Sequence, residues 1–180
     1  MSQRRATITH ASSHSSKRST PMVNADLDLR FEEMGERDIP AVTEVMARAF
    51  DDDAQRHLGE AKGGPDGYDN GDFFRTWLLG YQESVGYKVL AGPDIVGAMI
   101  VWINPNRHYV LGTIFVDPAW QNKGVGRRMW AFLRERYPEA LSWGLETPVW
   151  ATKNHHFYEQ SCGFKRVGQQ DDQYTYHQTL

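Results

Sequence analysis

The sequence predicts a mixed α+β domain in which helices pack on one central sheet. Three observations lead to this fold class: short alternating apolar runs recur along the chain, stretches with helical spacing separate them, and turn residues mark the boundaries. A chain of 180 residues suffices for one such domain and is short for two. Apolar residues make up 40% and charged residues 24%, as is ordinary for a soluble protein.

The first predicted elements are a strand and an amphipathic helix. Residues 27–31 alternate between apolar and polar side chains, which is typical of a strand. Apolar residues over 39–50 recur at helical spacing, with Pro40 in the first turn and Asp38 placed to cap the helix. The acidic and Gly-rich residues that follow predict a mobile loop over 51–71.

Three further helices and six further strands complete the plan. We expect the helices at 73–81, from 125 up to Pro138, and at 154–162, and the strands at 87–91, 95–103, 109–116, 141–145, 164–167 and 174–179. The order is one strand, two helices, three strands, a helix, a strand, a helix and two strands. This order predicts a sheet of about seven strands covered by helices.

The charge of the chain is unevenly distributed. Residues 1–25 contain four basic residues and no acid, whereas the rest contains 16 basic and 23 acidic residues, a net charge of −7. An acidic body argues against a nucleic-acid partner and favours a cationic one. Residues 1–25 are also too poor in apolar side chains to fold, so we expect a disordered tail followed by one domain over 26–180.

Compartment and metal content follow from a few residues. No stretch approaches the roughly 18 apolar residues of a membrane-spanning helix, so we expect no membrane partner. Cys162 is the one cysteine, which favours a reducing compartment such as the cytoplasm, although the Arg- and Ser-containing tail also resembles a mitochondrial presequence. His155 and His156 are adjacent and are expected at the surface or at a helix cap. No metal-binding spacing is present.

The residues that carry chemistry lie between a predicted strand and a predicted helix. Residues 121–126 read QNKGVG and open the helix that follows the strand ending at Val116. The first N–H groups of a helix have no partner within it, and the helix dipole adds positive potential there. Two glycines allow a ligand to approach the backbone, and Lys123, Arg127 and Arg128 add charge nearby. The turn therefore predicts a cradle for a pyrophosphate.

Two other phosphate-binding motifs fit less well. A P-loop requires Gly-x-x-x-x-Gly-Lys-Ser/Thr, which is absent from the sequence. A dinucleotide fingerprint needs a third glycine near position 129, where Met129 stands, and a parallel strand-helix-strand unit. The strands before the turn have the pattern of an antiparallel meander instead, so dinucleotide binding is a rival hypothesis.

Two motifs together resemble the GCN5-related N-acetyltransferase (GNAT) family. The first is Gln-x-x-Gly-x-Gly at 121–126, after a strand ending in Val-Asp-Pro. The second is Asn154, then Phe157-Tyr158, then Gly163-Phe164, on the helix after the fifth strand. The resemblance covers residues 27–180. It implies the GNAT fold, a mixed and mostly antiparallel sheet of about seven strands that splays between strands 4 and 5 and is flanked by helices.

The resemblance also implies the site. The co-substrate is acetyl-CoA, whose pantetheine arm lies between the splayed strands and whose pyrophosphate rests at the start of the third helix. By resemblance, the acyl-CoA-binding residues are Phe115, Val116, Gln121, Asn122, Lys123, Gly124, Val125, Gly126, Arg127, Asn154 and Tyr158. The N–H group of Val116 is the expected oxyanion donor, and Tyr158 is the expected general acid.

The general base is left open. The histone-modifying branch of the family carries a glutamate where Val110 stands, so this chain departs from that branch. Glu146, at the end of the fifth strand, can face the cleft as a base or an amine anchor. Asp117 is an alternative that fits the turn with Pro118 better, and a water chain is a third option. The three acids at 51–53 could attract a cationic amine or form a solvated loop.

The expected function is transfer of the acetyl group to a primary amine of a small molecule within a ternary complex. Holding both reactants together can be worth about 7–11 kcal/mol. The alternatives are acetylation of protein N-termini or lysine side chains, and a non-catalytic acyl-CoA-binding module. Because the family often dimerises through sheet edges, a homodimer is a further implication. Cys162 is expected to be a small buried hydrophobe and not a nucleophile.

Overall fold

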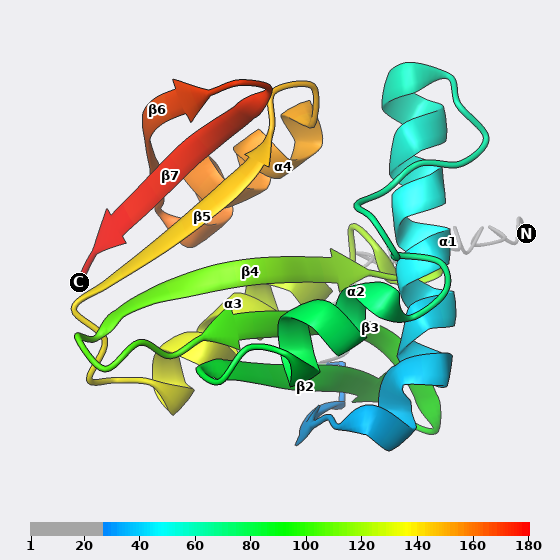
Figure 1. Ribbon diagram of the computed structural model, residues 1–180, viewed down its shortest axis with the longest axis horizontal. Coiled ribbons are helices and arrows are strands. Elements are labelled where there is room, and N and C mark those ends of the chain that lie inside the picture. Colours follow the sequence, from blue (N-terminus) through cyan, green and yellow to red (C-terminus); the bar gives the residue numbers. More distant parts are fainter. Residues whose placement is uncertain (1–26) are drawn as a thin grey trace, which may run out of the picture.

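The computed structural model describes residues 27–180 as a seven-stranded sheet with helices on both faces (Figure 1). The strands lie in the order β1-β2-β3-β4-β5-β7-β6. Their bounds are β1 Leu29–Glu33, β2 Ser84–Ala91, β3 Asp94–Trp102, β4 His108–Val116, β5 Ser142–Pro148, β6 Lys165–Gln170 and β7 Gln173–Thr179. Neighbouring strands are antiparallel except β4 and β5. The predicted mixed sheet is confirmed, while the tail expected over 1–25 lies outside the described residues.

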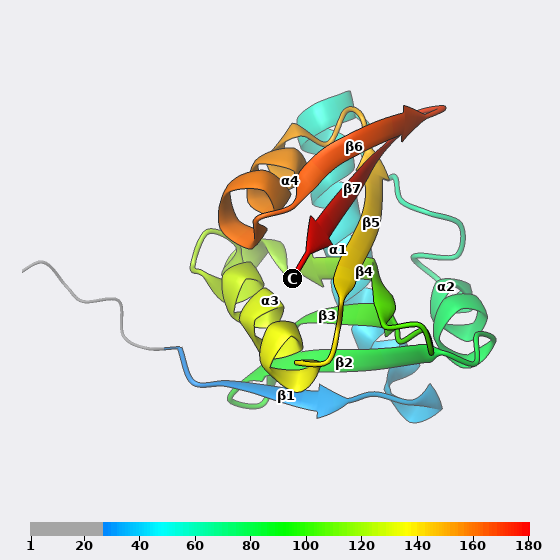
Figure 2. The ribbon, with the colours of Figure 1, turned by 90° about the vertical axis from the view of Figure 1, so that its left-hand side faces the viewer.

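Four α-helices cover the sheet in this part of the chain, and Figure 2 shows α2 and α3 on opposite sides of it. Two of them continue into π-helical turns, named η2 and η4. The helices are α1 Ile39–Leu58, α2 Asp72–Phe74 with η2 Arg75–Leu79, α3 Val125–Arg136, and α4 Thr152–His156 with η4 Phe157–Cys162. The 3₁₀ turns are η1 Glu36–Asp38 and η3 Pro118–Trp120. The second helix thus stops two residues before its expected end.

Two apolar clusters fill the two faces of the sheet. Successive residues of β3 alternate between them: Met99 and Val101 face the cluster under α3 and η4, and Ala98 and Ile100 face the cluster under α1 and α2. A strand buried on both faces reads as a continuous apolar run, and this explains the uninterrupted apolar stretch in its sequence.

α1 is two turns longer than the sequence analysis predicts. It continues to Leu58, so the acids at 51–53 lie on a helix, and the loop expected from residue 51 is wrong for its first eight residues. The acids are engaged along the helix: Arg56 pairs with Asp52 at 2.8 Å, and the hydroxyl of Tyr68 donates to Asp51 at 2.6 Å. Gly59 ends the helix in the left-handed conformation, with a φ of 71°, which glycine adopts at little cost.

Asp38 precedes α1 without capping it through its side chain. Its carboxylate instead accepts the N–H of Gly35 at 2.9 Å and pairs with Lys88 of β2 at 2.8 Å. The expected capping bond is therefore wrong. The same carboxylate ties the entry of the helix to the sheet, which fixes where α1 crosses it.

β4 and β5 are joined at one end only. The pairs are His108↔Ser142, Tyr109↔Trp143 and Val110↔Gly144, after which the two strands diverge (Figure 1). β5 stays paired with β7 along its whole length, so its other edge is the one that opens. The splay implied by the family resemblance is confirmed.

Candidate active site

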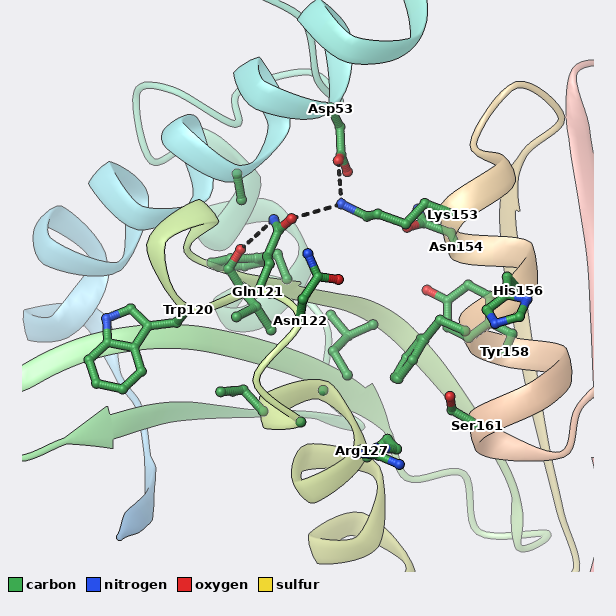
Figure 3. A pocket seen from close by; sticks show the side chains of 18 of the residues that line it. Asp53, Trp120, Gln121, Asn122, Arg127, Lys153, Asn154, His156, Tyr158 and Ser161 are labelled. Atoms are coloured by element: carbon green, nitrogen blue, oxygen red, sulfur yellow. Dashed lines mark hydrogen bonds and ion pairs between the residues drawn. The ribbon is translucent and has the colours of Figure 1, made fainter. Parts of the chain in front are cut away.

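A cavity of about 340 Å³ lies beside the end of β4 that is separated from β5 (Figure 3). Four parts of the chain surround it: α1, the end of β4, the turn that leads into α3, and α4 with η4. Its lining residues are Ala49, Phe50, Asp53, Ile114, Phe115, Val116, Trp120, Gln121, Asn122, Gly124, Val125, Gly126, Arg127, Lys153, Asn154, His156, Phe157, Tyr158 and Ser161. The cavity thus collects every cofactor-binding residue of the sequence analysis except Lys123.

The end of β4 turns part of its backbone towards this cavity. The N–H of Asp117 donates to a carbonyl of β3 at 2.8 Å, and the carbonyl of Phe115 lies 2.5 Å from where a Cβ would stand on Gly97 of β3. Backbone groups of successive residues point to alternate sides of a strand. Ile114 and Val116 therefore direct their N–H and C=O groups away from β3, towards the open side.

Ile114 is a residue that sequence reasoning missed. The prediction named Phe115 beside Val116, but the carbonyl of Phe115 points towards Gly97 of β3, and Ile114 lines the cavity as well. Counting in steps of two from the end of the strand would have selected Ile114 with Val116. The carbonyl of Val116 is engaged by the side-chain amide of Gln121, which donates to it at 3.0 Å.

The start of α3 presents free backbone donors to the cavity. Gly124 precedes the helix with a φ of 84°, and the first i→i−4 bond runs from the N–H of Arg128 to the carbonyl of Gly124 at 3.1 Å. The N–H groups of Val125, Gly126 and Arg127 therefore precede the first bond of the helix. A Cβ on Gly124 would meet nothing nearer than Arg127, at 3.6 Å. These donors and this open surface fit an anionic group such as a pyrophosphate.

Gly126 has a different role from Gly124. A Cβ at this position would stand 3.1 Å from the ring of Phe157 on η4, so the missing side chain lets the two helical segments pack closely. The sequence pattern predicts close approach of a ligand at both glycines. The structure adds helix packing as the reason for Gly126.

The three basic residues near the turn do not act alike. Arg127 lines the cavity (Figure 3). Lys123 extends over the ring of Trp120, with 5.1 Å between its Nζ and the ring centre. Arg128 donates to the carbonyl of Leu27 at 2.9 Å, which attaches the first described residues to α3. Of these three basic residues, Arg127 is thus the one that lines the cavity.

Tyr158 projects from η4 into the cavity, and Asn154 lines it from the preceding turn (Figure 3). Tyr158 is buried, and its ring packs against Phe164 and Tyr176 at centroid distances of 6.1 and 6.0 Å. Burial raises the pKa of its hydroxyl above the ordinary value, so the phenol keeps its proton at neutral pH. A protonated phenol in a cavity can donate to a developing anion.

A chain of hydrogen bonds crosses the cavity from α1 to β4 (Figure 3). The Nζ of Lys153 donates to Oδ1 of Asp53 at 2.7 Å and to Oε1 of Gln121 at 3.0 Å. The amide of Gln121 continues the chain to the carbonyl of Val116. We call these four residues the cross-cavity bridge. Sequence reasoning missed Lys153, since only the tertiary fold brings it beside a residue 100 positions away.

The two carboxylates considered as general base lie outside the cavity lining. Glu146 is exposed on β5, opposite Thr175 of β7. The side chain of Asp117 is 12% exposed, and it accepts the N–H of Ala119 at 2.9 Å and pairs with Arg48 at 2.7 Å. Asp117 therefore belongs to the turn after β4, as its position before Pro118 suggested. The role of Glu146 stays a prediction.

Two other residues can now be placed. His155 is buried, and its Nε2 lies 2.9 Å from the carbonyl of Pro148, so the expectation of a surface position is wrong for it. Its neighbour His156 is exposed. Cys162 is buried and free, and burial raises the pKa of its thiol to about 12, which agrees with a packing role.

Within residues 27–180, no three His, Cys, Asp or Glu side chains gather closely enough to hold a metal ion. Over the same residues, no helix is both long enough and apolar enough to cross a membrane.

Known proteins resemble this chain in both sequence and fold. A protein of Bacillus subtilis (strain 168), the uncharacterised YrkN, is 29% identical over 133 residues, which cover 73% of this chain and 70% of YrkN. An acetyltransferase from Thermus thermophilus superposes with a TM-score of 0.71 at 14% identity, over 84% of this chain and 97% of that one. The PaiA N-acetyltransferase of Thermoplasma acidophilum, solved in complex with coenzyme A, gives a TM-score of 0.68 at 11% identity, over 84% and 99% of the two chains.

The family model of the acetyltransferase (GNAT) family matches residues 42–164. This range runs from α1 to the end of η4 and includes both motifs of the sequence analysis together with the whole cavity lining. Since the match covers well over half of the sequence, the chain belongs to the acetyltransferase (GNAT) family and is an N-acetyltransferase.

Proposed function

We propose that the protein transfers the acetyl group of acetyl-CoA to a primary amine of a small molecule, in one step within a ternary complex. The observation that carries the proposal is that one cavity holds both the free N–H groups at the start of α3 and the open backbone edge of β4. The first suits the pyrophosphate and the second suits the amide groups of the pantetheine arm. The fold neighbour from Thermoplasma acidophilum was solved with coenzyme A.

The reaction is the attack of a neutral amine on the thioester carbonyl. We assign stabilisation of the resulting oxyanion to the N–H of Val116, because alternation along β4 directs it towards the cavity. One such donor is worth about 2.7–4 kcal/mol. We assign protonation of the departing thiolate to Tyr158, whose raised pKa keeps the proton available. Asn154 and the residues from Gln121 to Arg127 hold the coenzyme.

The cross-cavity bridge supports a small acceptor. It connects α1 to α4 over the cavity, so an extended polypeptide has less room there than a compact amine. The carboxylate of Asp53 can hold an ammonium group, as it already holds that of Lys153. Glu146 stands two residues beyond the last β4–β5 pair, where the strands begin to separate. We retain it as the proposed base or amine anchor, with transfer through water as the alternative.

Binding of the coenzyme is tested by substituting the glycine before α3. Gly124→Glu puts a bulky anion beside the free N–H groups, and we expect the protein to lose the stabilisation by acetyl-CoA seen in thermal unfolding. That stabilisation is about 2.7 kcal/mol at 100 times Kd for the wild type. Gly92→Glu is the matched control, because Gly92 also has a positive φ of 59° and a Cβ there meets nothing within 4 Å. Retained binding in Gly124→Glu would contradict the pyrophosphate assignment.

Turnover separates an enzyme from a module that only binds the coenzyme. We expect CoA release from acetyl-CoA to accelerate in the presence of at least one member of a panel of small primary amines. NAD serves as the negative ligand in the binding assay, since stabilisation by NAD would favour the dinucleotide alternative. Binding of acetyl-CoA without release of CoA, for any amine or for a peptide N-terminus, would favour the non-catalytic module.

A further inference from the structure

Lys153 places a primary amine in the cavity assigned to acetyl-CoA. It is the only lysine in the described part of the chain that lines this cavity. Val116 and Tyr158 line the same cavity. Its Nζ is held at 2.7 Å from Asp53 and 3.0 Å from Gln121. Through Gln121, it lies two hydrogen bonds from the carbonyl of Val116. A nucleophile of the same class as the proposed substrate therefore lines the same cavity as the proposed reacting groups.

We propose that Lys153 is a self-acetylation site, modified by the acetyl-CoA bound in its own cavity. This proposal rests on the proposed function, because it uses the same coenzyme position. Two features make the side chain competent. It is 40% exposed on a flexible four-carbon stem, so its Nζ can leave the bridge and move within the cavity. Its present partner is a carboxylate that can accept a proton from the ammonium group.

The step balances with the groups at hand. The ammonium of Lys153 gives one proton to Asp53, and the neutral Nζ forms a bond to the thioester carbon. The C–S bond breaks as the amide forms, and Tyr158 protonates the thiolate to give free CoA. The second proton of the nitrogen passes to water, Asp53 releases the proton that it accepted to solvent, and Tyr158 regains a proton from solvent. The net reaction converts a lysine ammonium and acetyl-CoA into acetyl-lysine, CoA and one proton.

Acetylation would change the cavity as well as the lysine. An amide carries no charge, so it cannot keep the ion pair with Asp53. The cross-cavity bridge would then open, and the carboxylate of Asp53 would become available to an ammonium group from solution. A single self-acetylation would therefore free the carboxylate of Asp53 to bind the ammonium group of an amine substrate.

The test is the rate of acetylation at individual lysines. The full chain is incubated with acetyl-CoA without any added amine, and peptide mass spectrometry follows Lys153 against Lys62. The side chain of Lys62 is 74% exposed outside the cavity, so it reports the uncatalysed reaction. We expect acetylation of Lys153 to be on the order of a hundredfold faster than that of Lys62. We also expect a rate constant that is independent of protein concentration, as a reaction within one chain requires.

Variants make the result decisive. Tyr158→Phe and Gly124→Glu should bring the rate at Lys153 down towards that at Lys62, while Gly92→Glu should leave it unchanged. Lys153→Arg should remove the modified peptide without raising acetylation elsewhere. The proposal is overturned if Lys153 reacts no faster than Lys62 in a protein that binds acetyl-CoA, or if its rate scales with protein concentration. Failure of the proposed function is recognised separately, because acetyl-CoA then does not bind, or binds without any small primary amine accelerating the release of CoA.

Discussion

The two ends of the β4–β5 pair differ in what completes their hydrogen bonds. At the joined end, the strands bond to each other over three residue pairs, and Tyr109 and Trp143 pack edge to face with 5.4 Å between their ring centres. At the open end, the carbonyl of Val116 is reached by a side chain, and the neighbouring backbone lines a cavity. An unpaired strand edge is normally a liability at a protein surface. Here helices enclose it, so it becomes a place where a ligand can complete the sheet.

The two ends of the β4–β5 pair therefore have different roles, one in the stability of the fold and the other in the proposed reaction. Tyr109 and Trp143 of the joined end are buried among aromatic rings, whereas Ile114 and Val116 of the open end line a cavity. Substitutions at the joined end should therefore lower the free energy of unfolding, and substitutions at the open end should change binding or turnover. The predictions below test this division, from the largest expected effect to the smallest.

Trp143→Ala tests the joined end. Trp143 is fully buried and contacts the rings of Tyr109, Trp130 and Tyr137. Truncating a buried aromatic residue leaves a cavity, so we expect the free energy of unfolding in denaturant to fall by about 3–5 kcal/mol. The Kd for acetyl-CoA of the remaining folded protein should stay within about twofold of wild type. A tenfold loss of affinity would show that the two ends are coupled.

Tyr158→Phe tests the open end. We expect kcat to fall by about a hundredfold or more, because the thiolate loses its proton donor, while the Kd for acetyl-CoA changes little. Tyr176→Phe is the matched control, since its ring packs beside Tyr158 and its hydroxyl donates to Glu159 at 2.8 Å. The control should lose about 1 kcal/mol of stability and keep its kcat. Wild-type kcat in Tyr158→Phe would remove the general-acid assignment.

Asp117→Asn asks whether the open end also contains purely structural residues. Asp117 pairs with Arg48 of α1, whose side chain is 52% exposed, so solvent screens part of this interaction. We expect a loss of about 1 kcal/mol in the free energy of unfolding and no change in kcat beyond about twofold. Arg48→Met should give a similar loss. If kcat falls much further in Asp117→Asn than in Arg48→Met, Asp117 would again be a candidate for the general base.

The effect of Cys162→Ala on the free energy of unfolding should depend on pH in the alkaline range. The thiol has a raised pKa of about 12 in the folded state against an ordinary value of 9.0, so the folded protein holds this proton more tightly than the unfolded chain. Stability from this group is present below pH 9 and is lost as pH rises from about 9 towards 12, by at most about 1.4 kcal/mol per pH unit. The difference between wild type and Cys162→Ala should shrink over this range. A difference in the free energy of unfolding that stays constant with pH would contradict the raised pKa of Cys162.

Much of this arrangement is readable from the sequence because local patterns carry it. Apolar patterns located every strand, with β3 as a continuous apolar run, and the paired motifs at 121–126 and 154–164 both contribute residues to one cavity. The coenzyme site that these motifs predict stays a prediction. The length of α1 was misjudged because three adjacent acids suggested a loop, although Gly59 is the residue that ends the helix. Ion pairing along the helix outweighs the weak helix propensity of aspartate.

Other features depend on contacts between distant segments and have no local pattern. His155 is buried because its ring packs between Tyr174 and Tyr176 of β7, which the adjacent histidine pair does not reveal. The cross-cavity bridge joins α1, the turn after β4 and α4. The sequence around Lys153 has no feature that distinguishes a bridging lysine from a solvated one. The π-helical geometry of η4 likewise has no signature in its residues.

The contact between Gly126 and Phe157 has a consequence for molecular length. One aromatic ring separates the start of α3 from η4, and the next residue of η4 is Tyr158, whose ring centre is 5.4 Å from that of Phe157. The ring of Phe157 thus acts as a spacer between the start of α3 and the phenol of Tyr158. We expect that a coenzyme analogue with a shorter or longer arm between its diphosphate and its sulfur would not place the sulfur beside the hydroxyl of Tyr158. Selection of the coenzyme would then depend on the length of this arm as well as on the charge of the diphosphate.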